Sequence, residues 1–222
     1  MAANDRAVVV MAKRPRPGAT KTRMMHALSA QRAADLYEAL LLDTIDMLVA
    51  RTDCTTLIAV DEPESAAYFS DVAPGLGQVQ QGAGALGDRL DRVLTEVLAR
   101  GFSDVFAINS DGPDLPPSHL DVAFASLGEE QTDLVFGPNV DGGYYLIGWK
   151  EPWPRVVTDV TMSTPTVLAD TLAIAESLGA AVTLAPEWFD VDVPDDLVRL
   201  ADSLAGAATR TAAFLNQRST SS

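Results

Sequence analysis

The sequence predicts an α/β protein built on one mostly parallel sheet with helices on both faces. Short apolar runs alternate with longer segments of helical spacing along the chain, an order typical of such a sheet. A length of 222 residues favours one large domain. Because neither a repeat nor a linker interrupts the pattern, we expect one domain over residues 1–205. A frayed tail rich in Ala, Thr and Ser is expected over residues 206–222.

The expected strands are short runs of apolar and β-branched residues. Arg6–Met11 is nearly continuous in Ala, Val and Met, which suits the buried centre of a sheet. The next runs are bounded by polar or turn-forming residues. They are Thr56–Val60, Val79–Gln81, Asp104–Asn109, Leu134–Phe136, Tyr144–Trp149, Ala181–Leu184 and Asp190–Val193.

The expected helices carry apolar residues at helical spacing. In Ser29–Arg51, Ser29 is a suitable N-cap, and leucines recur on one face. Gly101 suits the end of the helix that precedes it. The other expected helices are Pro63–Ser70, Leu86–Arg100, Pro117–Leu127, Thr166–Leu178 and a closing helix from Pro194.

Composition excludes several classes of function. The formal net charge of −15 argues against a nucleic-acid-binding surface, which requires a basic face. Cys54 is the single cysteine, so an internal disulfide or a cysteine-based zinc site is excluded. With His26 and His119 as its two histidines, the chain offers little for a histidine metal centre or a hydrolase triad. No signal-peptide pattern or membrane-length apolar run occurs, and we expect a cytoplasmic protein.

The segment 13–23 is a basic loop on an acidic chain. It holds five of the sixteen basic residues and no acid, and it follows the first apolar strand. Such a concentration of charge favours an anionic ligand, and phosphate oxygens are the natural guest. A solvated basic turn is the alternative.

An aspartate follows the fourth expected strand. Asp111 lies after the run 105–108, and Gly112 and Pro113 indicate a turn there. Ligands bind beyond the carboxyl ends of strands in such sheets, and a carboxylate facing a phosphate loop suits Mg²⁺. The alternative is that Asp111 and Asp114 are turn formers or helix caps.

A second acidic segment lies near the carboxyl end of the chain. Strand alternation would put Asp190 and Asp192 on one face, and either is a candidate for a second metal ligand. Pro194 suits the first turn of a helix. Asp195 and Asp196 would then lie near the helix N-terminus, in a structural role.

Two nucleotide-binding motifs match only in part. Residues 82–87 fit G-x-G-x-x-G, but the polar segment 77–81 before them does not suit the buried first strand of a dinucleotide-binding unit. A glycine-rich loop over a base or ribose is the better interpretation. Residues 18–22 resemble the end of a P-loop, but Thr20 replaces the glycine that should precede the lysine.

Five motifs together resemble a known family. They are Lys-x-Pro-x-Pro-Gly-x-x-Lys-Thr-Arg (13–23), Leu-Gly-Asp-Arg (86–89), Ser-Asp-Gly-Pro-Asp-Leu-Pro (110–116), Gly-Pro-x-x-Asp-Gly-Gly-Tyr-Tyr-Leu-Ile-Gly (137–148) and Asp-Val-Asp-x-Pro-x-Asp-Leu (190–197). The chain resembles the bacterial glycosyltransferase-A-like group of the nucleotide-diphospho-sugar transferase superfamily, some of whose members are labelled arsenosugar-biosynthesis glycosyltransferases. It is more distantly similar to phospholactate and molybdenum cofactor guanylyltransferases. Gly112 departs from the pattern, because a small hydroxyl residue is more usual there.

The resemblance implies a role for each motif. Lys21, Asp111 and Asp141 would be catalytic, and Asp111 and Asp192 would hold Mg²⁺ or Mn²⁺. The acceptor side would contain Gly142, Gly143 and Tyr144. For Arg89, an ion pair with Asp88 or Asp91 is the alternative. The nucleotide and its phosphates would be bound by Lys13, Gly18, Lys21, Thr22, Arg23, Gly87 and Arg89.

The same residues serve two chemistries. Mg²⁺ and basic side chains can stabilise a departing nucleoside diphosphate in glycosyl transfer or the reacting phosphoryl oxygens in nucleotidyl transfer. A hydroxyl acceptor benefits from a carboxylate base, for which Asp141 is the candidate. We favour a nucleotide-sugar donor with a small-molecule acceptor. Nucleotidyl transfer to a phosphorylated molecule is the alternative, and a non-catalytic nucleotide-binding protein is the third. We expect neither nucleic acid nor a membrane as a partner, and the sequence is compatible with a homodimer.

Overall fold

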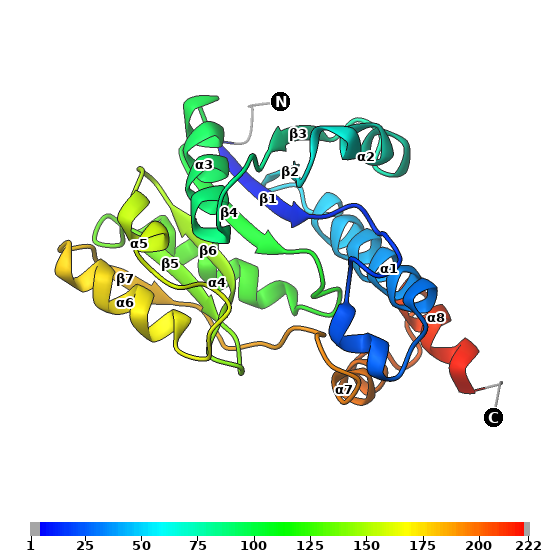
Figure 1. Ribbon diagram of the computed structural model, residues 1–222. Coiled ribbons are helices and arrows are strands. Elements are labelled where there is room, and N and C mark those ends of the chain that lie inside the picture. The colour runs from blue at the N-terminus through cyan, green and yellow to red at the C-terminus, as the bar shows by residue number, and fades with distance from the viewer. Residues whose placement is uncertain (1–4, 220–222) are drawn as a thin grey trace.

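The computed structural model describes residues 5–219, and this part of the chain forms one seven-stranded sheet (Figure 1). The strand order is β3-β2-β1-β4-β6-β5-β7. Neighbouring strands are parallel except around β6, which runs antiparallel to β4 and β5. The expected fold class is therefore confirmed. The strands are β1 (Arg6–Ala12), β2 (Thr55–Val60), β3 (Gly77–Gln80), β4 (Asp104–Asn109), β5 (Leu134–Pro138), β6 (Tyr144–Trp149) and β7 (Val182–Leu184).

Helices fill the connections between the strands. Most coincide with expected helices, but η1, α5 and α8 were not expected, because they are short or lie in polar segments. They are η1 (Thr22–His26), α1 (Ala30–Val49), η2 (Pro63–Ser65), α2 (Ala66–Val72), α3 (Leu86–Ala99), α4 (Pro117–Leu127), α5 (Pro154–Thr158), α6 (Val167–Ser177), α7 (Asp196–Ser203) and α8 (Arg210–Ser219).

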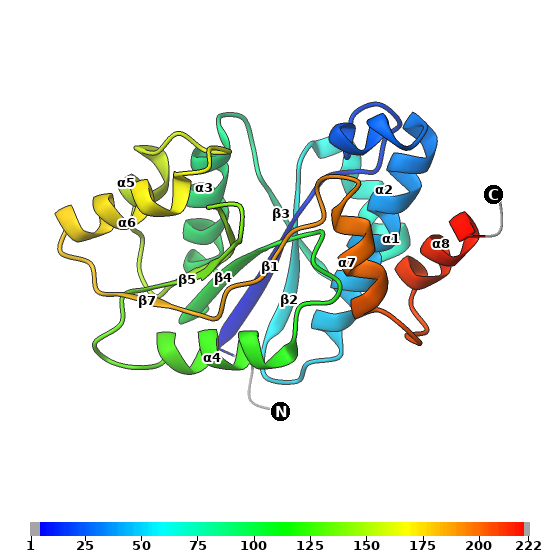
Figure 2. The ribbon, with the colours of Figure 1, turned by 90° about the horizontal axis from the view of Figure 1, so that it is seen from below.

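The sheet separates two apolar cores. Side chains alternate along β1, so that Val8 and Val10 face the core made with α1, α2 and α4, while Ala7 and Val9 face the core made with α3, α5 and α6. Figure 2 shows α4 on one side of the sheet and α3, α5 and α6 on the other. Because both faces are covered, β1 is apolar throughout its centre.

A third core holds the end of the chain against α1. Leu36 and Leu40 of α1 pack with residues of α7 and α8, including Phe214. The buried carboxylate of Asp43 accepts hydrogen bonds from the backbone nitrogens of Arg210 (3.1 Å) and Thr211 (2.7 Å) at the start of α8. The expectation of a frayed tail is therefore wrong for residues 210–219, while residues 220–222 lie outside the described residues.

The acidic segment 190–193 also differs from expectation. It is a loop between β7 and α7 rather than a strand. Asp196, on the first turn of α7, accepts hydrogen bonds from the backbone nitrogens of Asp192 (2.7 Å) and Val193 (2.8 Å). This contact explains the bend of the chain into α7 and gives Asp196 the structural role that we expected.

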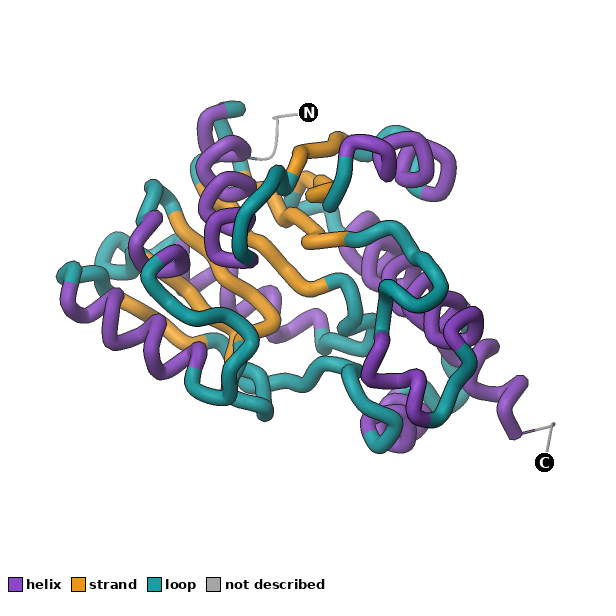
Figure 3. Tube along the Cα trace, in the orientation of Figure 1, coloured by secondary structure: helices purple, strands orange, loops and turns teal. Residues whose placement is uncertain are grey.

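Two loops leave the sheet side by side. β1 and β4 are parallel neighbours, and Met11 pairs with Asn109 near their carboxyl ends. The chain adds β2 and β3 on one side of β1 and returns to β4 on the other, so that a topological switch point lies between β1 and β4. In Figure 3 the loops after these strands leave the same edge of the sheet. Among the described helices, none has the length and apolar character of a membrane span.

Candidate functional site

Lys21 joins three of the expected motifs at this edge. Its ammonium donates hydrogen bonds to the carboxylates of Asp111 and Asp192, the latter at 2.9 Å. The side chain of Lys21 is only 5% exposed. Arg23 adds a longer contact, 3.3 Å from Nη1 to Asp192 Oδ2. Residues far apart in the sequence therefore meet at one cation.

The two carboxylates keep Lys21 charged. Burial alone would lower the pKa of Lys21, but Asp111 and Asp192 outweigh that effect and raise it above its usual value. Burial would likewise raise the pKa of Asp192, but the Lys21 ammonium lowers it below its usual range. At neutral pH, Lys21 and Asp192 are both ionised.

A cavity of about 260 Å³ lies between the basic loop and Asp111. Lys13, Lys21, Thr22 and Arg23 are among its lining residues. Gly18 lies on the loop with a φ of 77°, which favours glycine, and a Cβ there would meet open space. Three of the five cations of the basic loop, Lys13, Lys21 and Arg23, thus surround a space that suits phosphate groups.

Tyr37 fixes the base of this cavity, and no motif had singled it out. Its hydroxyl accepts a hydrogen bond from the Lys13 backbone nitrogen (3.0 Å) and contacts the Ser110 hydroxyl (2.9 Å). Burial raises the pKa of Tyr37 to about 12, so that it is a neutral hydroxyl. It connects the loop after β1 to the loop after β4.

Asp111 and Asp192 are suitable ligands for a magnesium ion. Both contact the same ammonium, so that their oxygens already converge on one cation. The described residues contain no group of three or more His, Cys, Asp or Glu side chains arranged as a metal centre. Mg²⁺ is often held by one or two carboxylates together with substrate phosphates, and this pair fits that arrangement once Lys21 gives up its position.

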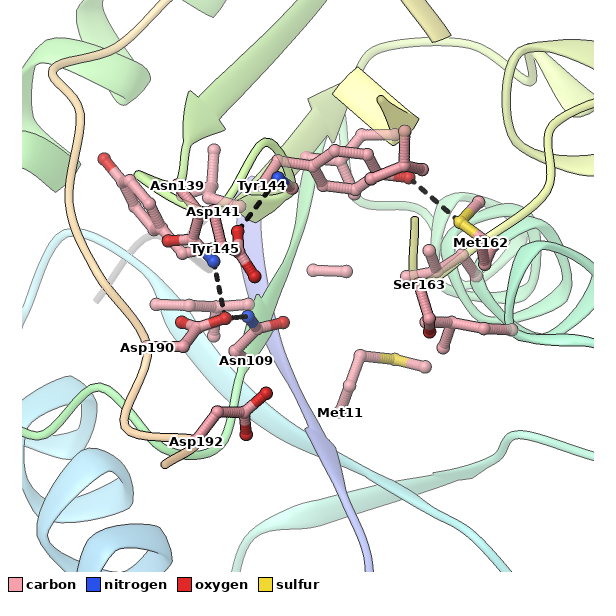
Figure 4. A pocket seen from close by; sticks show the side chains of 18 of the residues that line it. Met11, Asn109, Asn139, Asp141, Tyr144, Tyr145, Met162, Ser163, Asp190 and Asp192 are labelled. Carbon is pink, nitrogen blue, oxygen red and sulfur yellow. Dashed lines mark hydrogen bonds between the residues drawn. The ribbon is translucent and has the colours of Figure 1, made fainter. Parts of the chain in front are cut away.

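A larger cavity of about 460 Å³ adjoins the first (Figure 4). Met11, Arg23 and Asp192 line both cavities. Tyr144 contributes to the wall, and its hydroxyl donates to the sulfur of Met162 (3.7 Å). Burial raises the pKa of Tyr144 above its usual value. The two cavities could hold two reactants in contact.

The turn 141–143 borders this larger cavity. The Asp141 Oδ1 atom accepts a hydrogen bond from the Gly143 backbone nitrogen (2.9 Å). Gly142 has a φ of 87°, and a Cβ there would lie 1.8 Å from the carbonyl oxygen of Pro165. The turn is therefore closely packed, and Asp141 both stabilises it and lines the cavity.

A carboxylate and two amides form a network at the floor of the larger cavity. Asp190 Oδ2 accepts hydrogen bonds from Asn109 Nδ2 (2.7 Å) and Asn139 Nδ2 (Figure 4). Burial, followed by the charge of Asp111, raises the pKa of Asp190 well above its usual range. From the sequence, Asp190 was predicted only as an alternative metal ligand, and neither asparagine was a candidate site residue.

Comparison with known proteins places the chain in a family. Residues 44–164 match the model of the family described as "Uncharacterized protein conserved in bacteria (DUF2064)". The chain belongs to this family. Among curated protein sequences, none matches the chain.

Solved structures show where the fold of this DUF2064 member recurs. A protein from Desulfovibrio desulfuricans G20, described as a "putative nucleotide-diphospho-sugar transferase", is similar with a TM-score of 0.89 and 26% identity over 97% of this chain and 96% of that one. A cytidylyltransferase from Leptospira borgpetersenii serovar Hardjo-bovis (strain JB197) has a TM-score of 0.60 at 10% identity, covering 97% and 92%. A CMP:2-keto-3-deoxy-manno-octonic acid synthetase complexed with CTP has a TM-score of 0.52 at 12% identity, covering 90% and 98%. The last two likenesses show the fold alone.

Two residues of the expected nucleotide site have structural contacts in this DUF2064 member. A Cβ at Gly87 would lie 2.0 Å from the carbonyl oxygen of Val157, so that Gly87 allows α3 to pack against α5. Arg89 Nε donates to the carbonyl oxygen of Gly84 (3.0 Å) rather than to Asp88 or Asp91, the partners in the alternative interpretation. Neither residue lines the two cavities, and their role toward a nucleotide stays a prediction.

Proposed function

We propose that the chain is a metal-dependent transferase that moves a sugar from a nucleotide-sugar donor to a small-molecule acceptor. One observation carries the proposal: a cavity lined by three cations of the basic loop adjoins a larger cavity that contains Asp141. The likeness to the Desulfovibrio protein, which is described as a "putative nucleotide-diphospho-sugar transferase", supports the donor class. Assignment to the arsenosugar-biosynthesis type stays a prediction.

The donor's phosphates would lie in the smaller cavity. Lys13, Lys21 and Arg23 would bind their oxygens, with Thr22 as a further donor. Asp111 and Asp192 would hold Mg²⁺ or Mn²⁺, which would neutralise charge on the diphosphate leaving group. Stabilising that charge is the largest contribution these side chains can make to the reaction.

The acceptor would lie in the larger cavity. Gly143 and Tyr144 line it, Gly142 lies between Asp141 and Gly143 in the adjoining turn, and Asp141 presents a carboxylate to the same space. As a general base, Asp141 would take the proton of an acceptor hydroxyl as its oxygen bonds to the sugar. The proton would end on the Asp141 carboxylate, and the nucleoside diphosphate would leave.

Nucleotidyl transfer is the second candidate. Lys13, Lys21 and Arg23, the three basic residues that line the smaller cavity, would also suit the triphosphate of a nucleoside triphosphate. In that reaction a phosphorylated acceptor attacks phosphorus, pyrophosphate leaves, and no carboxylate base is needed.

A thermal-shift screen tests the proposal. Nucleoside triphosphates, diphosphates and nucleotide sugars are each added with and without Mg²⁺. A ligand at 100 times its Kd adds about 2.7 kcal/mol, equivalent to about 5–11 °C for a protein of this size. We expect a nucleotide sugar to give such a shift with Mg²⁺, and Lys21→Met to lose it. The matched control is Lys150→Met, because Lys150 contacts the carbonyl oxygen of Glu129 outside both cavities. If no nucleotide raises the melting temperature, the proposal is wrong.

A further inference from the structure

The larger cavity is poorly suited to an anionic molecule. Arg23 is the only cationic side chain among its described lining residues, and it contacts Asp192. Asp141 and Asp190 line the same space. Whether or not Asp190 carries a proton, the cavity has no excess of positive charge. If Mg²⁺ bound Asp192, the donor phosphates would balance the charge of the metal ion, and the larger cavity would still have no excess of positive charge.

The polar groups that line it, Asn109, Asn139 and Asp190, instead suit a neutral hydroxyl. Asn109 ends β4 and Asn139 follows β5, on the two sides of β6. Both amides donate to one oxygen of Asp190, so that Asp190 holds them across the end of β6. Asn139 is also fixed by its backbone, whose nitrogen donates to the Gly143 carbonyl oxygen (3.0 Å).

Asn109 is the more accessible of the two amides in this network. Its side chain is half-buried, whereas that of Asn139 is 4% exposed. The Asp190 contact fixes the plane of the Asn109 amide and uses one of its two N–H groups. The amide oxygen has no hydrogen bond to a described residue, and the second N–H is free to donate. An oriented donor and acceptor side by side suit a hydroxyl, which can accept and donate at once.

The walls add an apolar surface. Met11, Leu86, Leu90, Tyr144 and Met162 line the cavity, and Figure 4 shows Met11, Tyr144 and Met162 around its open centre. Such side chains can pack against the C–H faces of a sugar ring. A volume of about 460 Å³ falls within the range of small-molecule sites.

We infer that the larger cavity binds an uncharged, sugar-sized polyhydroxyl acceptor, and that Asn109, positioned by Asp190 and Asn139, recognises one of its hydroxyl groups. This inference rests on the proposed function, because it treats the larger cavity as the acceptor site. Asn109 is then a specificity-determining residue, and Asp190 and Asn139 are positioning residues.

Methionine methyl groups provide a direct test, because Met11 and Met162 line the cavity and the chain has only six methionines. The full chain is labelled with ¹³C at the methionine methyl groups, and the two signals are assigned from Met11→Leu and Met162→Leu. Glucose, ribose, glucose 6-phosphate and ribose 5-phosphate are titrated at equal ionic strength. We expect the neutral sugars to shift both signals. At Met162, which lines the larger cavity alone, the phosphate esters should bind at least about tenfold more weakly, which is about 1.4 kcal/mol.

Asn109→Ala should lose most of the response to the neutral sugars. Asn216→Ala is the matched control, because Asn216 is exposed on α8. Asn109→Ala loses the hydrogen bond to Asp190, so its melting temperature should fall, but the increase that a nucleotide adds to that temperature should match the increase in the parent. If Asn109→Ala does not fold, the comparison of neutral and phosphorylated sugars on the parent chain decides alone.

The possible failures are distinguishable. Equal or tighter binding of a phosphate ester at Met162, a full response in Asn109→Ala, or no shift with either neutral sugar would each overturn the inference. If sugars shift the methyl signals but no nucleotide raises the melting temperature, the proposed function is wrong while the neutral-sugar site stands.

Discussion

Replacing Lys21 with methionine should weaken the fold and strengthen metal binding at the same time. The Lys21 ammonium contacts Asp111 and Asp192, and these side chains are 5%, 17% and 44% exposed. Removing one member of a fully buried ion pair costs about 3–5 kcal/mol. Because both carboxylates keep contact with water, we expect a smaller loss of about 1–3 kcal/mol. For a chain of this length, that lowers the melting temperature by about 2–12 °C.

The same ion pairs oppose the binding of Mg²⁺ to the free protein. A metal ion that binds Asp111 and Asp192 must displace the Lys21 ammonium. The free energy of the lost ion pairs therefore makes the free energy of metal binding less favourable. Without nucleotide, Lys21→Met should therefore bind Mg²⁺ about 5–150-fold more tightly, the equivalent of about 1–3 kcal/mol. In the parent, a nucleotide should restore metal affinity, because its phosphates offer the ammonium another partner.

Isothermal titration calorimetry with Mg²⁺ measures this effect, and thermal unfolding measures the loss of stability. Lys150→Met is the control, since its ammonium contacts only a carbonyl oxygen among the described residues. It should change neither quantity by an amount comparable with Lys21→Met. Equal or weaker Mg²⁺ binding in Lys21→Met would refute the reasoning, because it would mean that the lysine and the metal do not share these carboxylates.

Three other predictions concern single residues. The pKa of Asp192 is lowered in the folded protein. Its charge therefore stabilises the fold at pH values above the pKa of an aspartate in the unfolded chain, about 3.9, and this stabilisation is lost as the pH falls through the lower pKa of the folded state. The difference in melting temperature between the parent and Asp192→Asn should therefore shrink from pH 7 to pH 2, and a constant difference would exclude the ion pair with Lys21 as its cause. Asp141→Asn should keep donor affinity, by calorimetry, while steady-state turnover falls by about 10²–10⁴-fold; unchanged turnover would exclude Asp141 as the base. Gly142→Ala should lower the melting temperature, because its Cβ would lie 1.8 Å from the Pro165 carbonyl oxygen, and a neutral result would mean that the turn can relax.

The sequence predicted the central sheet well, because burial on both faces leaves a strong signal. The apolar run of β1 and the leucines of α1 need no tertiary information to be recognised. In the structure, β1 and β4 are neighbouring strands, and this brings the basic loop close to Asp111. What could not be predicted is the ion pair itself, because Lys21 and Asp192 are 171 positions apart and either could have faced solvent.

Other parts of the site left a weak signal or none. Asn109 and Asn139 belong to no motif, and their importance comes from Asp190, which the fold brings between them. The helix α8 was missed because its few apolar residues lie among Thr, Asn, Gln, Arg and Ser and form no repeating apolar pattern. A clue existed in Asp43, an acidic residue on the buried face of α1, since a buried carboxylate needs hydrogen-bond donors from elsewhere in the chain.

The phosphorus-containing product tests the central claim most directly. Purified protein is incubated with Mg²⁺, nucleotide sugars and nucleoside triphosphates, and a small-molecule extract of bacterial cells that supplies acceptors. The products are followed by ³¹P NMR, with Lys21→Met as the inactive control. Sugar transfer predicts that a nucleoside diphosphate accumulates from one nucleotide sugar only when parent protein and acceptor extract are both present. Release of pyrophosphate from a nucleoside triphosphate would contradict the proposed reaction and establish nucleotidyl transfer in its place.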